Sequence, residues 1–123
     1  MAYYVALHPC LGASGCAADY TPDEIGAILD SAAAEFAVDA VVLREIARCE
    51  SGFNDNAINS SSRALGLGQH LPRFWVDRAT AIGYPATADP FDPVVNARVT
   101  AWLLATDGTS PWAPWSGHCS TAY

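Results

Sequence analysis

The sequence predicts a single domain that is mainly helical, and three observations support this fold class. Apolar residues recur at helical spacing in four separate stretches of the chain. Three of these stretches begin at a proline, a residue that suits the first turn of a helix. Little of the chain shows the alternation of apolar and polar residues that is typical of strands. The 123 residues, 51% of them hydrophobic, are enough to bury one core.

The first helix is expected to begin after Thr21 and to run to about Phe36. Thr21 suits the N-cap position, Pro22 suits the first turn, and Glu24 is placed to complete a capping box. The residues before this helix, 1–20, are rich in Gly and Ala, and we interpret them as an irregular arm.

A second helix is expected between its cap, Asp39, and Glu50. Leu43, Ile46 and Ala47 form its apolar stripe. Glu50 follows Ala47 by three residues and Ile46 by four. Because a helix turns by about 100° per residue, Glu50 falls within the apolar stripe, which is an unusual position for a glutamate.

The position of Glu50 predicts a chemical role. A carboxyl group on an apolar face loses hydration in its charged form, so its pKa rises and the group stays protonated nearer neutral pH. A general acid in glycosidic cleavage needs this property, because it must give a proton to the leaving oxygen. The alternative is that Glu50 only ends its helix and extends into solvent.

The rest of the chain is expected to hold one turn-rich segment and two more helices. Residues 51–63 are rich in Ser, Asn, Asp and Gly, which favours turns or a short hairpin. Pro72 begins the third helix, and Gly83 suits its C-terminal end. The last helix is expected to follow Asp92-Pro93 and to end near Gly108.

Charge and hydropathy argue against several classes of partner. Thirteen acidic residues against six basic ones give a net charge of −7, which disfavours nucleic acid and anionic membrane surfaces as partners. No apolar run approaches the roughly 20 residues of a membrane-spanning helix. We therefore expect a soluble protein. No cofactor is expected. Residues 1–9 contain no Lys or Arg, so no export signal is expected there.

Three motifs in order resemble the soluble lytic transglycosylases. Glu50-Ser51 is followed, after the turn-rich segment, by Gly66-Leu67-Gly68-Gln69 and then by the helix-starting Pro72. Asn96 stands where these families place an asparagine at the head of a helix. Cys49, Trp115 and Cys119 make the chain more similar to the resuscitation-promoting and related wall-lytic domains of actinobacteria and their phages.

The chain also departs from these families at two places. Gly68 replaces a bulky residue of the motif, and we expect it to widen the cleft. The Ala-Tyr-Asn motif of many transglycosylases has no clear counterpart near residues 111–116, which puts the final chemical step in question.

The resemblance covers roughly residues 21–119 and implies a lysozyme-like α+β fold, in which a helical domain with a substrate groove stands beside a small hairpin-like lobe. It implies cleavage of the β-1,4 bond between N-acetylmuramic acid and N-acetylglucosamine of bacterial peptidoglycan. A transglycosylase uses the 6-hydroxyl of the muramic acid as nucleophile, whereas an inverting hydrolase needs a second carboxylate at about 6.5 to 9.5 Å. Asp55 is the candidate for that water-positioning base, and an exposed turn residue is the favoured interpretation.

Other residues are expected to bind the substrate. By resemblance, Gln69, Ser51 and Asn96 belong to the site, and the Gln69 amide offers both a donor and an acceptor. Trp112 and Trp115 offer flat faces on which sugar rings pack, although core packing or groove walls explain them equally well.

The four cysteines, Cys10, Cys16, Cys49 and Cys119, point to an oxidising destination and permit three pairings. We expect Cys49 to pair with Cys119 and Cys10 with Cys16. A zinc site that uses His8, Cys10 and Cys16 with His118 or Cys119 is the weaker alternative, so no metal is expected. A phage-encoded protein that acts outside the cell reconciles cysteine pairs with the missing signal.

Two other function classes stay open. The domain is alternatively a virion or wall-binding module that docks glycan without cutting it. It is less well explained as an inhibitor or a structural tail component. Other virion or lysis proteins are therefore included among the expected partners.

Overall fold

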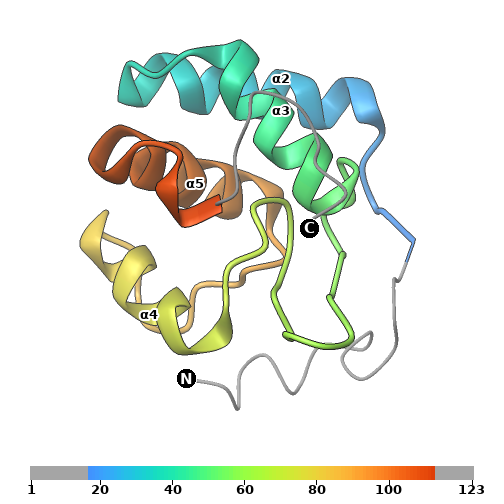
Figure 1. The fold of residues 1–123 in the computed structure, drawn as a ribbon, viewed down its shortest axis with the longest axis vertical. Helices are drawn as coiled ribbons and strands as arrows, with labels where there is room; N and C mark the ends of the chain where they lie inside the picture. Colours follow the sequence, from blue (N-terminus) through green and yellow to red (C-terminus); the bar gives the residue numbers. More distant parts are fainter. Residues whose placement is uncertain (1–16, 113–123) are drawn as a thin grey trace.

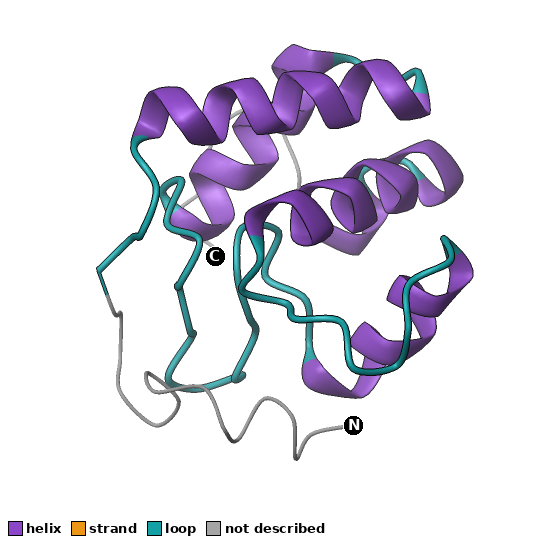
Figure 2. Cartoon of the chain, turned by 180° about the vertical axis from the view of Figure 1, so that it is seen from behind, coloured by secondary structure: helices purple, strands orange, loops and turns teal. Residues whose placement is uncertain are grey.

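The computed structural model describes residues 17–112, which fold into four α-helices and one short 3-10 turn. The helices are α2 (Pro22–Phe36), α3 (Ala40–Ser51), α4 (Pro72–Ala81) and α5 (Pro93–Asp107), and the turn η1 spans Ser110–Trp112 (Figure 1). The predicted mainly helical fold is confirmed. Helices and loops make up the whole of this described range, with no strand (Figure 2).

The helix starts follow the caps that the sequence predicts. Thr21 forms both halves of a capping box with Glu24, and Asp39 and Asp92 each accept hydrogen bonds from two backbone N–H groups of the helix they precede. Helix α4 begins at Pro72 without a side-chain cap and ends at Ala81. Local sequence therefore determines where most helices begin.

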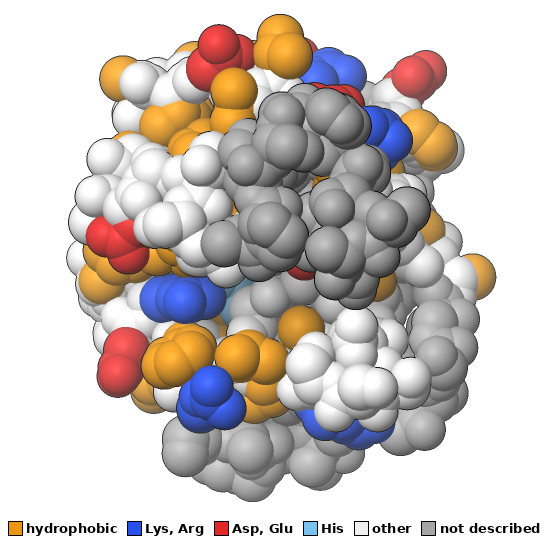
Figure 3. Space-filling view, viewed as in Figure 1, with side chains coloured by type: hydrophobic (Ala, Val, Ile, Leu, Met, Phe, Trp, Pro, Cys, Tyr) orange, Lys and Arg blue, Asp and Glu red, His pale blue; other side chains and the backbone are white. Residues whose placement is uncertain are grey.

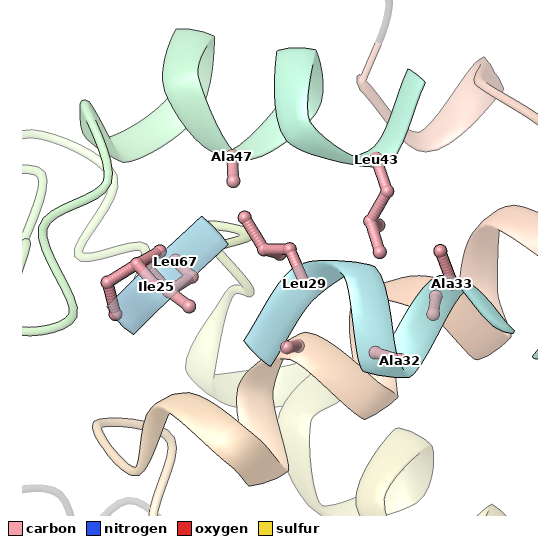
Figure 4. Packing of buried hydrophobic residues seen from close by; sticks show 9 residues of the cluster. Ile25, Leu29, Ala32, Ala33, Leu43, Ala47 and Leu67 are labelled. Atoms are coloured by element: carbon pink, nitrogen blue, oxygen red, sulfur yellow. The ribbon is translucent and has the colours of Figure 1, made fainter. Parts of the chain in front are cut away.

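The core lies where α2 packs against both α3 and α5. Figure 4 shows Leu29 of α2 between Ala47 and Leu43 of α3 and the underlying α5. Alanines at the contact surfaces lack long side chains, which allows the helices to approach closely. These residues are buried: Ile25, Leu29, Ala32, Ala33, Leu43, Ala47, Leu67, Ala97 and Ala101.

The segment between α3 and α4 is rich in turns, which is one of the two forms that the sequence predicts, and it has no strand ladder. Its only pairing consists of two isolated antiparallel bridges, Ile58 with Leu65 and Leu65 with His70. Phe53, Arg63 and Gln69 have positive φ angles, as does Gly66. These left-handed positions turn the chain repeatedly, so no run of residues stays extended long enough to form a ladder.

Of the predicted N-terminal arm, residues 17–20 are described, and they form neither helix nor strand. Asn56 Nδ2 donates to the backbone oxygen of Ala17 at 3.1 Å and to the side chain of Asp19 at 3.0 Å. The arm is thereby attached to the turn after α3. Across residues 17–112, the helices are too short or too polar to cross a bilayer.

Candidate active site

Glu50 occupies the last turn of α3, where the sequence predicts it. Gly52 ends the helix in the left-handed conformation at φ 63°, a backbone shape that glycine adopts without strain. Ile46 and Ala47, one turn earlier, are buried in the core. The apolar stripe of α3 therefore extends to Glu50, and the carboxyl group lies against the protein interior.

Burial changes the protonation of Glu50. Its Oε2 atom is buried and has no hydrogen-bond partner among residues 17–112. No other buried side-chain oxygen or nitrogen in this range lacks a partner. Loss of hydration disfavours the charged form, so burial raises the pKa of Glu50 from 4.5 to about 7. The carboxyl group can therefore both give and take a proton near neutral pH.

Glu50 lines a cavity of about 350 Å³. The wall comes from three parts of the chain: the end of α3, the segment between α3 and α4, and η1. Figure 3 shows this face of the molecule, which is hollowed beside the start of α4 and the loop that precedes it. Its lining residues are Glu50, Asn59, Ser62, Ala64, Gln69, Leu71, Pro111 and Trp112.

Gln69 forms part of the cavity wall and also braces its own loop. Its Nε2 group donates to the backbone oxygens of Gly66 at 2.9 Å and Ala57 at 3.2 Å. These bonds use the two donors of the amide and hold the left-handed backbone at φ 54°. The amide oxygen remains the part of Gln69 suited to accept a hydrogen bond from a ligand.

Trp112 closes the cavity on the η1 side. The ring is buried, packs against Ile46 and Leu103, and donates from Nε1 to the Gly68 backbone oxygen at 3.1 Å. One tryptophan thus serves as core residue and cavity wall, so the two interpretations of the sequence are compatible. Trp115 lies outside the described residues, and its role stays a prediction.

Asn96 lies in the core and not on the cavity wall. Its side chain is 0% exposed. Oδ1 accepts from the Gly68 N–H at 2.9 Å, and Nδ2 donates to the backbone oxygens of Pro90 at 2.8 Å and Leu65 at 3.3 Å. Asn96 therefore holds the loop that carries Gln69, and the expected direct contact with substrate gives way to a supporting role.

Gly68 was expected to widen the cleft, but the structure gives its small size a different role, in the core. A Cβ atom at this position would lie 2.2 Å from Thr100 Oγ1 and 2.8 Å from His70 Nε2. Its missing side chain therefore makes room for the buried Thr100–His70 pair. The expected widening of the cleft is not what the structure shows.

His70, the residue after Gln69, is buried although it follows a turn-rich segment. The ring is 1% exposed, and burial beside Arg78 lowers its pKa to about 3. Arg78 Nη1 lies 3.0 Å from Nδ1, and a guanidinium only donates, so the His70 proton is on Nε2, which faces Thr100 Oγ1 at 2.9 Å. The Thr100 hydroxyl donates to the Asn96 backbone oxygen at 2.7 Å. This network links α4 to α5 behind the cavity wall.

Asp55 is neither exposed nor on the cavity wall. Its side chain is 1% exposed and accepts hydrogen bonds from the backbone N–H groups of Asp19 at 3.1 Å and Tyr20 at 3.3 Å. The expected turn is present, but the carboxylate fixes the N-terminal arm, and burial raises its pKa. Water positioning next to Glu50 is not supported by this location.

We expect Asp55→Asn to lower the free energy of unfolding by about 1–2 kcal/mol, because a neutral amide is a weaker acceptor for two N–H groups. The glycan cleavage that the resemblance implies should stay within about twofold of the wild type, since Asp55 does not line the cavity. Thermal melting and a cleavage assay on the same preparation test this. A hundredfold loss of activity at unchanged stability would instead restore Asp55 as the water-positioning base.

Ser51 and the cysteines complete the predicted set. The Ser51 hydroxyl donates to the Ala47 backbone oxygen at 2.8 Å and does not line the cavity. Cys49 is disulfide-bonded. Cys10, Cys16 and Cys119 lie outside residues 17–112, so both pairings and the zinc alternative stay predictions. Within the described range, no group of His, Cys, Asp and Glu side chains is arranged to hold a metal ion.

The fold and the cavity define a class of protein: a small helical domain whose cleft is lined by a single acidic side chain, which is partly buried and has a raised pKa. The family model of the transglycosylase SLT domain matches residues 28–111, which include α3, α4, α5 and all the cavity-lining residues except Trp112. A search of curated proteins found no match. The chain belongs to the transglycosylase SLT domain family, whose members are lytic transglycosylases in the lysozyme-like superfamily.

Proposed function

We propose that this protein is a lytic transglycosylase that cuts the β-1,4 bond between N-acetylmuramic acid and N-acetylglucosamine, with Glu50 as its general acid. The observation that carries the proposal is the Glu50 carboxyl group. It is buried in the cavity wall, its Oε2 lacks a hydrogen-bond partner among residues 17–112, and its pKa is about 7. A substrate oxygen is a suitable partner for that atom.

The proposed reaction needs one carboxyl group in two protonation states. Glu50 gives its proton to the glycosidic oxygen while the bond from that oxygen to C1 of the muramyl sugar breaks. The 6-hydroxyl of the same sugar then forms a bond to C1 and returns its proton to the Glu50 carboxylate. The product is a 1,6-anhydro ring, and Glu50 is again protonated for the next cycle.

The distribution of acidic residues favours this route over hydrolysis by an inverting enzyme. All thirteen Asp and Glu residues of the chain lie between Asp19 and Asp107, within the described range. Glu50 is the one acidic side chain among the residues that line the cavity. Hydrolysis with inversion requires a second carboxylate on the opposite face of the sugar, whereas the internal hydroxyl requires none.

Two wall residues are proposed to orient the glycan. The Gln69 amide oxygen is a suitable acceptor for an acetamido N–H or a hydroxyl group, because its Nε2 is already held by Gly66 and Ala57. Trp112 offers an apolar ring face beside Glu50, with its N–H already bonded to Gly68.

We place the site of action at the bacterial cell wall, outside the cell that makes the protein, and we propose a phage origin.

The pH dependence of cleavage tests the role of Glu50 as acid. With a pKa of about 7, the fraction of protonated Glu50 falls about tenfold per pH unit above that value. We therefore expect kcat/KM to be nearly constant from about pH 5 to 6 and to fall with that slope above pH 7. Release of soluble fragments from purified peptidoglycan measures it. An activity that rises above pH 7 would contradict an acid role for Glu50.

A further inference from the structure

The basic residues divide into two groups. All six are arginines, and three of them form ion pairs: Arg44 with Asp30, Arg48 with Glu45, and Arg98 with Glu35. These pairs involve only α2, α3 and α5. Arg63, Arg73 and Arg78 make no ion pair within the described part of the chain, and they lie in the segment before α4 or on α4 itself.

The arginines without an ion pair lie in or next to the segment that supplies the cavity wall, although none of them lines the cavity. Residues 56–76 contain two arginines and no acidic residue, so this segment has a charge of +2 in a chain whose net charge is −7. The same segment supplies most of the cavity lining, including Ser62 and Ala64 on either side of Arg63. In Figure 3, basic side chains lie over α4 and the preceding loop, beside the hollow. The cavity is thus bordered by positive charge on a negatively charged protein.

Two of these arginines are held in place by an exposed aromatic ring. Phe74 is 40% exposed, and the guanidinium carbons of Arg73 and Arg78 lie 4.8 Å and 5.0 Å from its ring centroid. Stacking on a ring orders the guanidinium and leaves its in-plane N–H groups available for a planar acceptor such as a carboxylate. Phe74 thereby orders the exposed Arg73 and the half-buried Arg78 on one surface.

Arg78 joins this group to the cavity wall. Its Nη1 contacts His70 Nδ1 at 3.0 Å, and His70 directly follows the wall residue Gln69. At the other end of the group, Arg73 follows the wall residue Leu71 by two positions. The ring, its two cations and the cavity therefore belong to one continuous surface.

We infer that the surface formed by Arg63, Arg73, Phe74 and Arg78 binds the carboxylates of the peptide stems that muramic acid carries. This inference rests on the proposed function, because a glycan strand in the cavity brings its stems to the border of the cavity. A strand without stems keeps one lactyl carboxylate on each muramic acid, next to the sugar ring, whereas the stems carry further carboxylates away from the ring. Arg63, Arg73 and Arg78 do not line the cavity itself, so the carboxylates of the stems are the ones suited to reach them. Charge complementarity selects the stem-bearing substrate. The enzyme then discriminates substituted strands from bare glycan.

The test measures binding separately from cleavage. In a Glu50→Gln background, the affinity for soluble glycan strands with peptide stems is compared with that for the same strands stripped of stems by an amidase. We expect Arg63→Gln with Arg73→Gln to weaken binding of stem-bearing strands by about tenfold, and binding of stripped strands by less than about twofold. Arg78 is left intact because it holds His70.

The matched control is Arg44→Gln with Arg48→Gln, which removes the same charge from arginines that are already paired. We expect its affinity for both strands to be unchanged. Equal loss for both strands, equal loss in the control, or no loss at all would overturn stem recognition. Failure of the wild-type protein to cut either strand would instead contradict the proposed function, and the binding difference would still report on the stems.

Discussion

Glu50→Gln is expected to reduce cleavage of purified peptidoglycan by about three orders of magnitude. The amide keeps the shape of the side chain but has no proton to give to the leaving oxygen, and general acid catalysis accounts for about 10²–10⁴-fold in rate. The control is Glu45→Gln, on the same helix, which removes a half-buried carboxylate that pairs with Arg48 and does not line the cavity. Turbidity of a peptidoglycan suspension measures both. An active Glu50→Gln variant would remove Glu50 from the mechanism.

The same substitution should change how stability depends on pH. The folded-state pKa of Glu50, about 7, lies above its ordinary value of 4.5, so the fold favours the protonated form. The contribution to stability is complete below pH 4.5 and is lost as the pH rises through about 7. After allowance for partial exposure to solvent, we expect a loss of about 1–2 kcal/mol in the wild type. Urea unfolding at pH 4.5 and 8 should show a smaller loss in Glu50→Gln.

Asn96→Ala is expected to lower the free energy of unfolding by about 3–4 kcal/mol, because it leaves the buried Gly68 N–H and Pro90 oxygen without partners and opens a cavity. Urea unfolding measures this, with Val94→Ala as control at an exposed site on the same helix. We expect that control to change stability by less than about 0.5 kcal/mol. Activity should fall too, because the loop that carries Gln69 loses its support.

A supporting role for Asn96 differs from direct substrate contact in one measurable way. A residue that only contacted substrate would reduce activity at unchanged stability. If Asn96→Ala unfolds at the same urea concentration as the wild type, the role that we assign to Asn96 is contradicted.

Local signals predicted the helices and the orientation of Glu50. The side chains of Thr21, Asp39 and Asp92 accept hydrogen bonds from backbone N–H groups no more than four residues away. Their capping roles can therefore be predicted from the local sequence. Helical periodicity is equally local, and it placed Glu50 on the buried face of α3. These inferences required no knowledge of how the helices pack.

Long-range contacts were not predictable in this way. Asp55 is buried because it binds Asp19 and Tyr20, which lie 36 and 35 residues away, and His70 is buried because it meets Thr100, 30 residues away. A polar residue in a turn-rich segment has the same local signature whether it is exposed or bonded to a distant group. The supporting role of Asn96 was hidden for the same reason, since its partner Gly68 lies 28 residues away.

The most direct test of the central claim is mass spectrometry of the fragments that the purified protein releases from peptidoglycan. If Glu50 works without a second carboxylate and returns its proton from the 6-hydroxyl, the muramic acid ends will carry the 1,6-anhydro ring, and Glu50→Gln will release almost none. Reducing muramic acid ends, one water heavier, would contradict the account, because they require a water molecule as the nucleophile.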